Sequence, residues 1–136
     1  MKKLIVLILF ALIGINSIYA SSPKDELQKI DNANVKVRKK CDLNDQAKIE
    51  NQYLEFIAKN PNYQAQAYIH LGELFSVHVP AALQNPSKAM DYYIKAEQVA
   101  TDSADIGMAK YNIALIYYRG FGVPQDFLKA AEKCGE

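Results

Sequence analysis

Net charge is nearly absent from this sequence. Sixteen lysine and arginine residues stand against fifteen aspartate and glutamate residues, so the formal net charge at pH 7 is +1. A chain this close to neutrality lacks the positive surface on which nucleic-acid binding depends. The short basic run at residues 38–40 does not alter this, because such a run is typical of a solvated helix end. We therefore expect no nucleic-acid partner.

Side chains that build catalytic and metal sites are equally scarce. The chain contains two histidines, His70 and His78, and two cysteines, Cys41 and Cys134. The histidines are eight residues apart, and no cysteine or carboxylate completes a metal-ligand spacing around them. No Ser-His-Asp or Cys-His arrangement is visible. These absences predict a protein without a metal, a cofactor or a catalytic residue.

A long hydrophobic run occurs only at the N-terminus. Lys2 and Lys3 precede the apolar residues 4–15, and Ala20 supplies a small residue for cleavage. This order is typical of a secretory signal peptide, here residues 1–20. The alternative is an uncleaved membrane anchor, but the run is shorter than the roughly 20 apolar residues that span a bilayer. We expect export to the periplasm or the medium, with no stable membrane anchor after cleavage near Ala20.

Strand signals are missing from the remaining 116 residues, which are enough for one domain. Glycine and proline are confined to a few places, and between them the apolar residues recur with the helical period. Three pairs place a capping residue before a proline, as at a helix start: Ser22-Pro23, Asn60-Pro61 and Asn85-Pro86. The predicted helices cover residues 45–59, 62–77, 86–100, 104–118 and 125–134.

Residues 21–44 are predicted to be either an N-terminal tail or an amphipathic helix. Leu27, Ile30, Val37 and Cys41 would share one face of a helix over residues 23–41. The asparagine-rich residues 31–34 weaken that helix, because asparagine side chains compete for backbone hydrogen bonds. Both alternatives stay open at this point.

An internal repeat organises the rest of the chain. Residues 67–75 match residues 109–117 at an offset of 42, and the pair Lys88-Ala89 matches Lys129-Ala130 at an offset of 41. Two helices within a period of this length predict a stacked helical array. Small residues are expected where two helices of a hairpin approach closely, and Leu71 is expected to fill the groove between them. The fold class predicted is all-α, a short α/α superhelical solenoid of helix-turn-helix repeats following a signal peptide.

The second copy of the repeat carries a specific pattern. Its loop continues with two glycines, the first suited to a left-handed position at the helix end, and with Asp126, suited to restarting a helix. Residues 109–130 resemble the Sel-1-like repeat, a relative of the tetratricopeptide repeat, and depart from it mainly at Ala114, where glycine is usual. The repeat signature comprises Ala67, Leu71, Gly72, Ala109, Tyr117, Gly120, Gly122, Asp126 and Ala130.

The resemblance covers a clear copy at residues 105–134 and a degenerate copy at residues 63–100, within an array at residues 45–136. It implies an exported, non-catalytic scaffold that binds another protein. An envelope chaperone or assembly adaptor would share this fold and differ only in its partner. Tyr68, Tyr111 and Tyr118 are the candidate partner-binding residues, because exposed aromatic rings are good binding anchors.

An enzymatic alternative comes from the same family. Some cysteine-rich members are described as β-lactamases, and residues 21–24 form an S-x-x-K sequence. That motif lies directly after the expected cleavage site and has no S-D-N or K-T-G companion. The chain also lacks the cysteine pairs of those members. A periplasmic hydrolase is therefore the second hypothesis, behind protein binding.

The two cysteines and the last helix lead to further expectations. Four predicted helices separate Cys41 from Cys134, and neighbouring helices pack about 8–10 Å apart, whereas a disulfide needs Cα atoms within about 7 Å. We expect the two cysteines not to pair with each other, which leaves free thiols or a bond between chains. The last predicted helix reaches only Glu136 and leaves its hairpin partly uncovered, which favours self-association through the C-terminal end.

Overall fold

Six α-helices make up the fold that the computed structural model describes for residues 20–135, so most of the predicted signal peptide lies outside the described residues. The helices are α2 Pro23–Lys40, α3 Leu43–Lys59, α4 Gln64–Leu74, α5 Pro86–Val99, α6 Ser103–Arg119 and α7 Phe127–Gly135. Short 3-10 turns occur at Pro61–Tyr63 and Ala81–Leu83. This part of the chain contains no strand, and the predicted all-α class is confirmed.

Two of the three predicted capping residues, Ser22 and Asn85, cap a helix. The Ser22 side chain accepts a hydrogen bond from the Asp25 backbone and completes a capping box at the start of α2. The Asn85 side chain caps α5 by accepting from the Lys88 backbone, without a reciprocal bond. Asn60 is the exception: it makes no side-chain cap, and its amide instead donates to the Phe56 carbonyl. A 3-10 turn over Pro61–Tyr63 comes next, and α4 begins at Gln64, two residues later than predicted.

Residues 23–40 form a helix in spite of their asparagine-rich middle. Asn34 is buried, its amide donates to the Tyr53 hydroxyl at 3.4 Å, and its oxygen accepts from Arg38 Nε at 3.3 Å. Because both polar ends of the side chain have partners, Asn34 does not compete with the backbone of α2. The amphipathic-helix alternative for this segment is the correct one.

Helix α4 ends at Leu74, three residues before the predicted end. Gln46 of α3 reaches into the following loop and donates from Nε2 to the carbonyls of Leu74 and Leu83, at 2.9 and 2.7 Å. Ser76 also folds back and donates to the Glu73 carbonyl at 3.0 Å. These bonds satisfy carbonyls that a longer helix would use internally, so the chain turns early.

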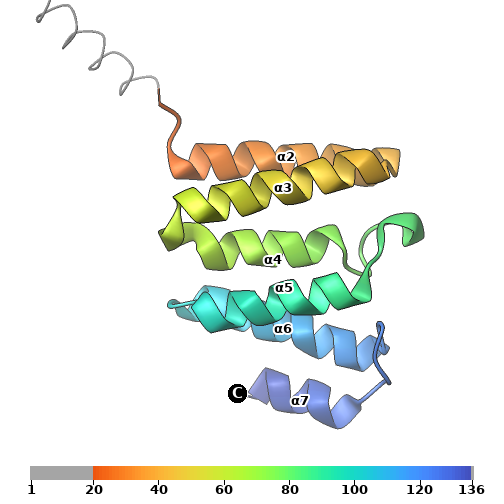
Figure 1. The fold of residues 1–136 in the computed structure, drawn as a ribbon. Coiled ribbons are helices and arrows are strands. Elements are labelled where there is room, and N and C mark those ends of the chain that lie inside the picture. The colour runs from red at the N-terminus through yellow and green to blue at the C-terminus, as the bar shows by residue number, and fades with distance from the viewer. Residues whose placement is uncertain (1–19, 136) are drawn as a thin grey trace, which may run out of the picture.

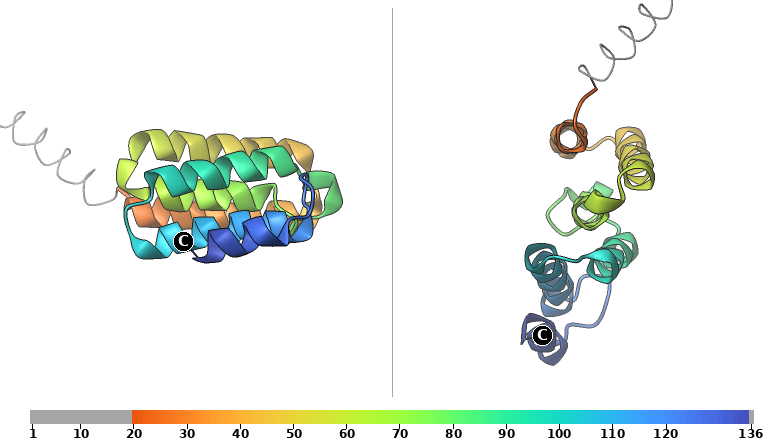
Figure 2. Two further views of the ribbon diagram at one scale, coloured as in Figure 1. Left: turned by 90° about the horizontal axis from the view of Figure 1, so that it is seen from below. Right: turned by 90° about the vertical axis from the view of Figure 1, so that its left-hand side faces the viewer.

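The helices are stacked in chain order from α2 at one end to α7 at the other, and successive helices run in opposite directions (Figures 1 and 2). Each helix packs against the next, and α4 also contacts both α2 and α6. The three hairpins α2–α3, α4–α5 and α6–α7 are therefore joined through a row of their first helices. This is the packing expected of helix-hairpin repeats.

Small residues lie at the close approaches that the repeat predicts. Ala67, Leu71 and Ala109 are each fully buried, and Gly72 lies against the Tyr93 ring of α5. On α5, two tyrosines are adjacent, Tyr92 and Tyr93. The structure buries both, Tyr93 in the hairpin interface and Tyr92 beneath the ring of Tyr68.

The loop between α6 and α7 follows the glycine pattern of the repeat. Gly120 has φ +66° and ends α6, and Gly122 has φ +71° and packs against Pro86 at the start of α5. The Asp126 backbone returns a 2.9 Å hydrogen bond to the Tyr117 carbonyl, and its side chain accepts from the Lys129 backbone at the start of α7. The predicted left-handed position of Gly120 is confirmed.

Two further expectations concern the membrane and the cysteines. Among the described residues, no helix combines the length and the apolar character needed to cross a bilayer. Cys41 ends α2 at a positive φ of 55° and Cys134 lies on α7, both exposed and both free thiols. They lie at opposite ends of the stack, consistent with the geometric argument against their pairing (Figure 1).

Candidate functional site

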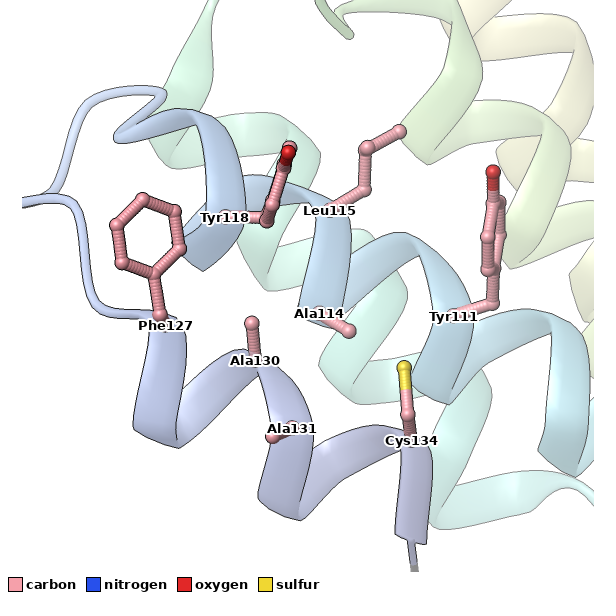
Figure 3. Close-up of a pocket in the computed structure, with 8 residues that line it drawn as sticks. All are labelled: Tyr111, Ala114, Leu115, Tyr118, Phe127, Ala130, Ala131 and Cys134. Carbon is pink, nitrogen blue, oxygen red and sulfur yellow. The ribbon is translucent and has the colours of Figure 1, made fainter.

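An apolar groove of about 330 Å³ lies between α6 and α7 (Figure 3). We call it the α6–α7 groove. Its lining consists of Tyr111, Ala114, Leu115, Tyr118, Phe127, Ala130, Ala131 and Cys134. Nearly every one of these side chains is apolar or aromatic, so the groove suits an apolar partner surface.

Helical spacing explains why these residues come together. Tyr111, Leu115 and Tyr118 are four and three residues apart, and therefore lie along one face of α6. Phe127 and Cys134 lie seven residues apart and mark the ends of a matching face on α7. The two faces meet because α6 and α7 are consecutive antiparallel helices in close contact.

The walls of the groove are aromatic and open to solvent. The exposed fractions are 57 % for Tyr111, 56 % for Tyr118 and 59 % for Phe127. The Tyr118 and Phe127 rings contact each other edge to face, with centroids 5.4 Å apart. Rings held in this way lose little conformational freedom when a partner binds, which makes them effective anchors.

Two alanines form the floor. Ala114 is 3 % exposed and Ala130 is 6 % exposed, and both line the groove, one from each helix. Ala114 is the position at which this chain departs from the repeat pattern. Its single methyl group still allows close helix contact, and the groove between the larger flanking side chains stays open.

Positive charge borders one end of the groove. A second hollow adjoins it at Tyr111 and Cys134 and is lined in part by Lys110 and Lys133. Lys133 also forms an ion pair with Glu97 of α5 at 3.0 Å. This end therefore has polar groups at its rim, while the rest of the groove is apolar.

Tyr68 does not belong to this groove. Its half-buried ring stacks on Tyr92 with centroids 6.2 Å apart, and Lys95 lies over both rings. The structure thus brings two of the three predicted tyrosines, Tyr111 and Tyr118, to one site and places Tyr68 in the packing between α4 and α5.

A cluster of charged groups joins α2, α3 and α4. The Tyr53 hydroxyl donates to Asp31 Oδ1 at 2.6 Å, and His70 lies 3.6 Å from Asp31 and 3.4 Å from Glu73. Arg38 lies 3.7 Å from Glu73 and completes the cluster. Every group has a partner within the protein, so the cluster holds three helices together rather than presenting a free catalytic group.

Two pKa values follow from this geometry. Burial by itself would lower the pKa of His70, but the hydrogen bond that His70 donates to Glu73 and the charges of Asp31 and Glu73 outweigh it and raise that pKa. Burial would likewise raise the pKa of Glu73, but the hydrogen bond and charge of His70, with Arg38, lower it. The charged forms of both side chains are thus favoured in the folded protein.

The His70 interaction predicts a pH-dependent stability. The pKa of His70 is raised on folding. Its contribution to the free energy of unfolding is therefore fully present below the pKa of the unfolded chain, about 6.5, and is lost as the pH rises through the pKa of the folded protein. We expect His70→Gln to lower the free energy of unfolding relative to wild type. This loss is expected to be about 0.5–1 kcal/mol larger at the low-pH end of this window than at the high-pH end. Urea denaturation at several pH values measures the difference. His78→Gln is the comparison, because His78 is exposed in the loop after α4 and acts on Glu73 only through its charge, so its pH trend is expected to be smaller. An equal pH trend in both variants would exclude the assignment to His70.

The second serine of the S-x-x-K sequence, Ser22, has a structural role. Ser22 caps α2, and its hydroxyl donates to Asp25 at 2.8 Å while accepting from the Asp25 backbone. Within the described residues, no group of three or more potential ligands is placed to hold a metal ion. The groove is therefore the feature on which a function can be built.

Phe127 and Cys134 are two of the six groove residues that the sequence does not single out as binding candidates. Their apolar spacing on the last helix is visible in the sequence, but their position opposite Tyr111 and Tyr118 depends on how α7 packs. Comparison of the chain with protein-family models, with curated proteins and with solved structures gave no match. The family resemblance therefore depends on the repeat residues themselves.

Proposed function

We propose that this chain is an exported protein-interaction module, a short solenoid of Sel-1-like repeats that binds another protein without catalysing a reaction. The observation that carries the proposal is the α6–α7 groove, in which Tyr111, Tyr118 and Phe127 are all more than half exposed. Exposed aromatic rings around an apolar depression are typical of protein-binding sites.

The shape of the groove supports a helical partner segment. Two parallel walls, each built from residues along one helix face, match an amphipathic helix better than an extended strand. No unpaired sheet edge exists in the described residues to add a strand, because these residues contain no strand. The backbone of a partner helix is satisfied internally, so only apolar side chains need to enter the groove.

The packing of the remaining helices supports a scaffold role. The cluster around Asp31 and His70 joins α2 to α4, and Glu50 of α3 binds both Lys88 and Tyr92 of α5 at 2.7 and 2.6 Å. Adjacent hairpins are thus tied together on both rows of helices. A partner that docks at one end would meet a preorganised surface.

Site-specific photo-crosslinking tests the proposal. A photoreactive phenylalanine analogue at position 118 is expected to give a protein adduct in cells that export the chain, whereas the same analogue at exposed Ala58 on α3 is expected to give none. Mass spectrometry of the adduct identifies the bound protein. If neither position gives an adduct, or if both give the same one, the groove is not the binding site.

A further inference from the structure

The stacking order within the fold indicates what kind of element fills a groove between the two helices of a hairpin. Helix α4 packs against both α2 and α3, and α6 packs against both α4 and α5. Each hairpin is thus covered by the first helix of the next (Figure 1). The α6–α7 groove is the same place on the next hairpin, and no described helix covers it. Its natural occupant is an α-helix that runs parallel to α6.

Residues at matching repeat positions show the effect of such a cover. At the repeat offset, Tyr111 corresponds to Ile69 on α4, and Tyr118 corresponds to Ser76, which lies two residues after α4 ends. Ile69 is 4 % exposed and Ser76 is 2 % exposed, and Ile69 packs with Ala109 of the covering helix α6. The two tyrosines, which lack a covering helix, are more than half exposed.

The outer face of α2 does not suit this position. Lys29, Asn32 and Lys36 are all exposed there, and the large apolar side chains of α2 other than Val35 point into the stack. A head-to-tail contact, with α2 of another copy in the groove, would bury these polar groups without partners. Such a contact would also leave both ends of an open chain of copies unsatisfied.

Helix α7 is the described helix whose own apolar face lacks a cover. Phe127, Ala131 and Cys134 are four and three residues apart and are all exposed, and neighbouring Leu128 is 79 % exposed. This face adjoins the groove, since Phe127, Ala131 and Cys134 also line it (Figure 3). A helix with the same face is what the groove requires.

Resting on the proposed function, we propose that the protein that fills the groove is a second copy of this chain, with α7 of each copy lying in the α6–α7 groove of the other. A two-fold axis perpendicular to α7 sets this helix antiparallel to its copy, which makes the copy parallel to α6, as the stack requires. The lengths also match: the nine residues of α7 span about 13 Å, and the stretch from Tyr111 to Tyr118 spans about 10 Å.

The apolar area is sufficient for a weak dimer. An aromatic side chain exposes about 200 Å² when free, so the three groove rings at 56–59 % exposure offer about 350 Å² in each copy. Leu128 and Ala131 raise this to about 500 Å², or about 1,000 Å² for the pair, which is the lower bound for a specific interface. We therefore expect a dimer whose population rises with concentration.

The two-fold arrangement also places the cysteines. The small side chain of Ala131 lies near the axis and allows the helices to cross closely, and Phe127 then faces Cys134 of the partner subunit. The two Cys134 residues are separated by about 10 Å along the helices, beyond the reach of a disulfide. The dimer is therefore non-covalent.

Light scattering on the exported chain, residues 21–136, tests the association. Wild type is expected to approach twice the monomer mass as concentration rises, and Ala131→Glu is expected to lose the dimer because it places a charge at the helix crossing. The control Ala58→Glu makes the same exchange at an exposed site on α3, and circular dichroism checks that both variants fold. A wild type that stays monomeric, or equal effects of the two variants, would overturn the inference.

Disulfide trapping tests the antiparallel geometry. In a Cys41→Ser background, Phe127→Cys is expected to form a covalent dimer with Cys134 on mild oxidation, because residues 127 and 134 of one helix are about 10 Å apart and do not bridge. The background with Cys134 alone is expected to stay uncrosslinked. Crosslinking through Cys134 alone, or no trapping by Phe127→Cys, would overturn the arrangement. A monomer that still crosslinks a different protein at position 118 would contradict this inference and leave the proposed function intact.

Discussion

Replacing Gly72 with alanine is expected to lower the free energy of unfolding by about 2 kcal/mol, although alanine is the better helix former. An added Cβ at position 72 would lie 2.7 Å from Tyr93 Cζ and closer still to Tyr93 Cε1. The Tyr93 ring is 1 % exposed and packed on all sides, so it has no room to move away. Thermal or urea unfolding of the variant measures the loss.

The chain supplies a matched control for this substitution. Gly107 also lies inside a helix, but a Cβ at that position would meet nothing within 4 Å. Gly107→Ala is therefore expected to raise the free energy of unfolding by up to about 1 kcal/mol through helix propensity alone. If both glycine substitutions changed stability in the same direction, the contact between Gly72 and Tyr93 would not limit the packing of α4 and α5.

A double-mutant cycle separates the contact from other effects. Tyr93→Leu removes the ring that the new methyl group would strike, and it also removes a buried hydroxyl that has no hydrogen-bond partner. In the Tyr93→Leu background, Gly72→Ala is expected to cost clearly less than in wild type. An interaction energy near zero would place the strain elsewhere.

Local sequence signals predicted the helices well because each helix carries its own apolar period and, in most cases, its own cap. The errors occur where distant residues intervene. The end of α4 depends on Gln46, which lies 28 residues before the carbonyl of Leu74 to which it donates. The helicity of residues 31–34 depends on Tyr53, which supplies a partner for Asn34 from another helix. Neither partnership is visible in a helical period.

The same distinction applies to the candidate site. Tyr111 and Tyr118 could be proposed from sequence because exposed aromatic rings are good binding anchors. Tyr68 is not at the repeat position of either tyrosine, and it stacks on Tyr92 beneath Lys95 of α5 instead. The depth of the groove depends on how α7 packs against α6, which in turn depends on the loop that positions α7.

The loop between α6 and α7 is the basis of the second prediction with a large effect on stability. Gly120 and Gly122 both have positive φ, a conformation that costs an alanine about 1 kcal/mol. At Gly120 an added Cβ would meet Gln125 and Val123 at 3.1–3.3 Å, contacts that a surface loop can relax. At Gly122 it would overlap Pro86 Cβ and lie 3.0 Å from Pro86 Cγ, and a proline ring in the first turn of α5 is rigid.

We therefore expect Gly122→Ala to cost about 2–4 kcal/mol and Gly120→Ala about 1–2 kcal/mol, because only the first adds a steric overlap to the backbone strain. Denaturant unfolding compares the two variants, and hydrogen exchange of the α7 amides reports whether the last helix separates from α6. Equal losses would mean that the loop is not held against Pro86. A larger loss at Gly122, with faster exchange confined to α7, would show that this contact between the loop and α5 holds the groove in shape.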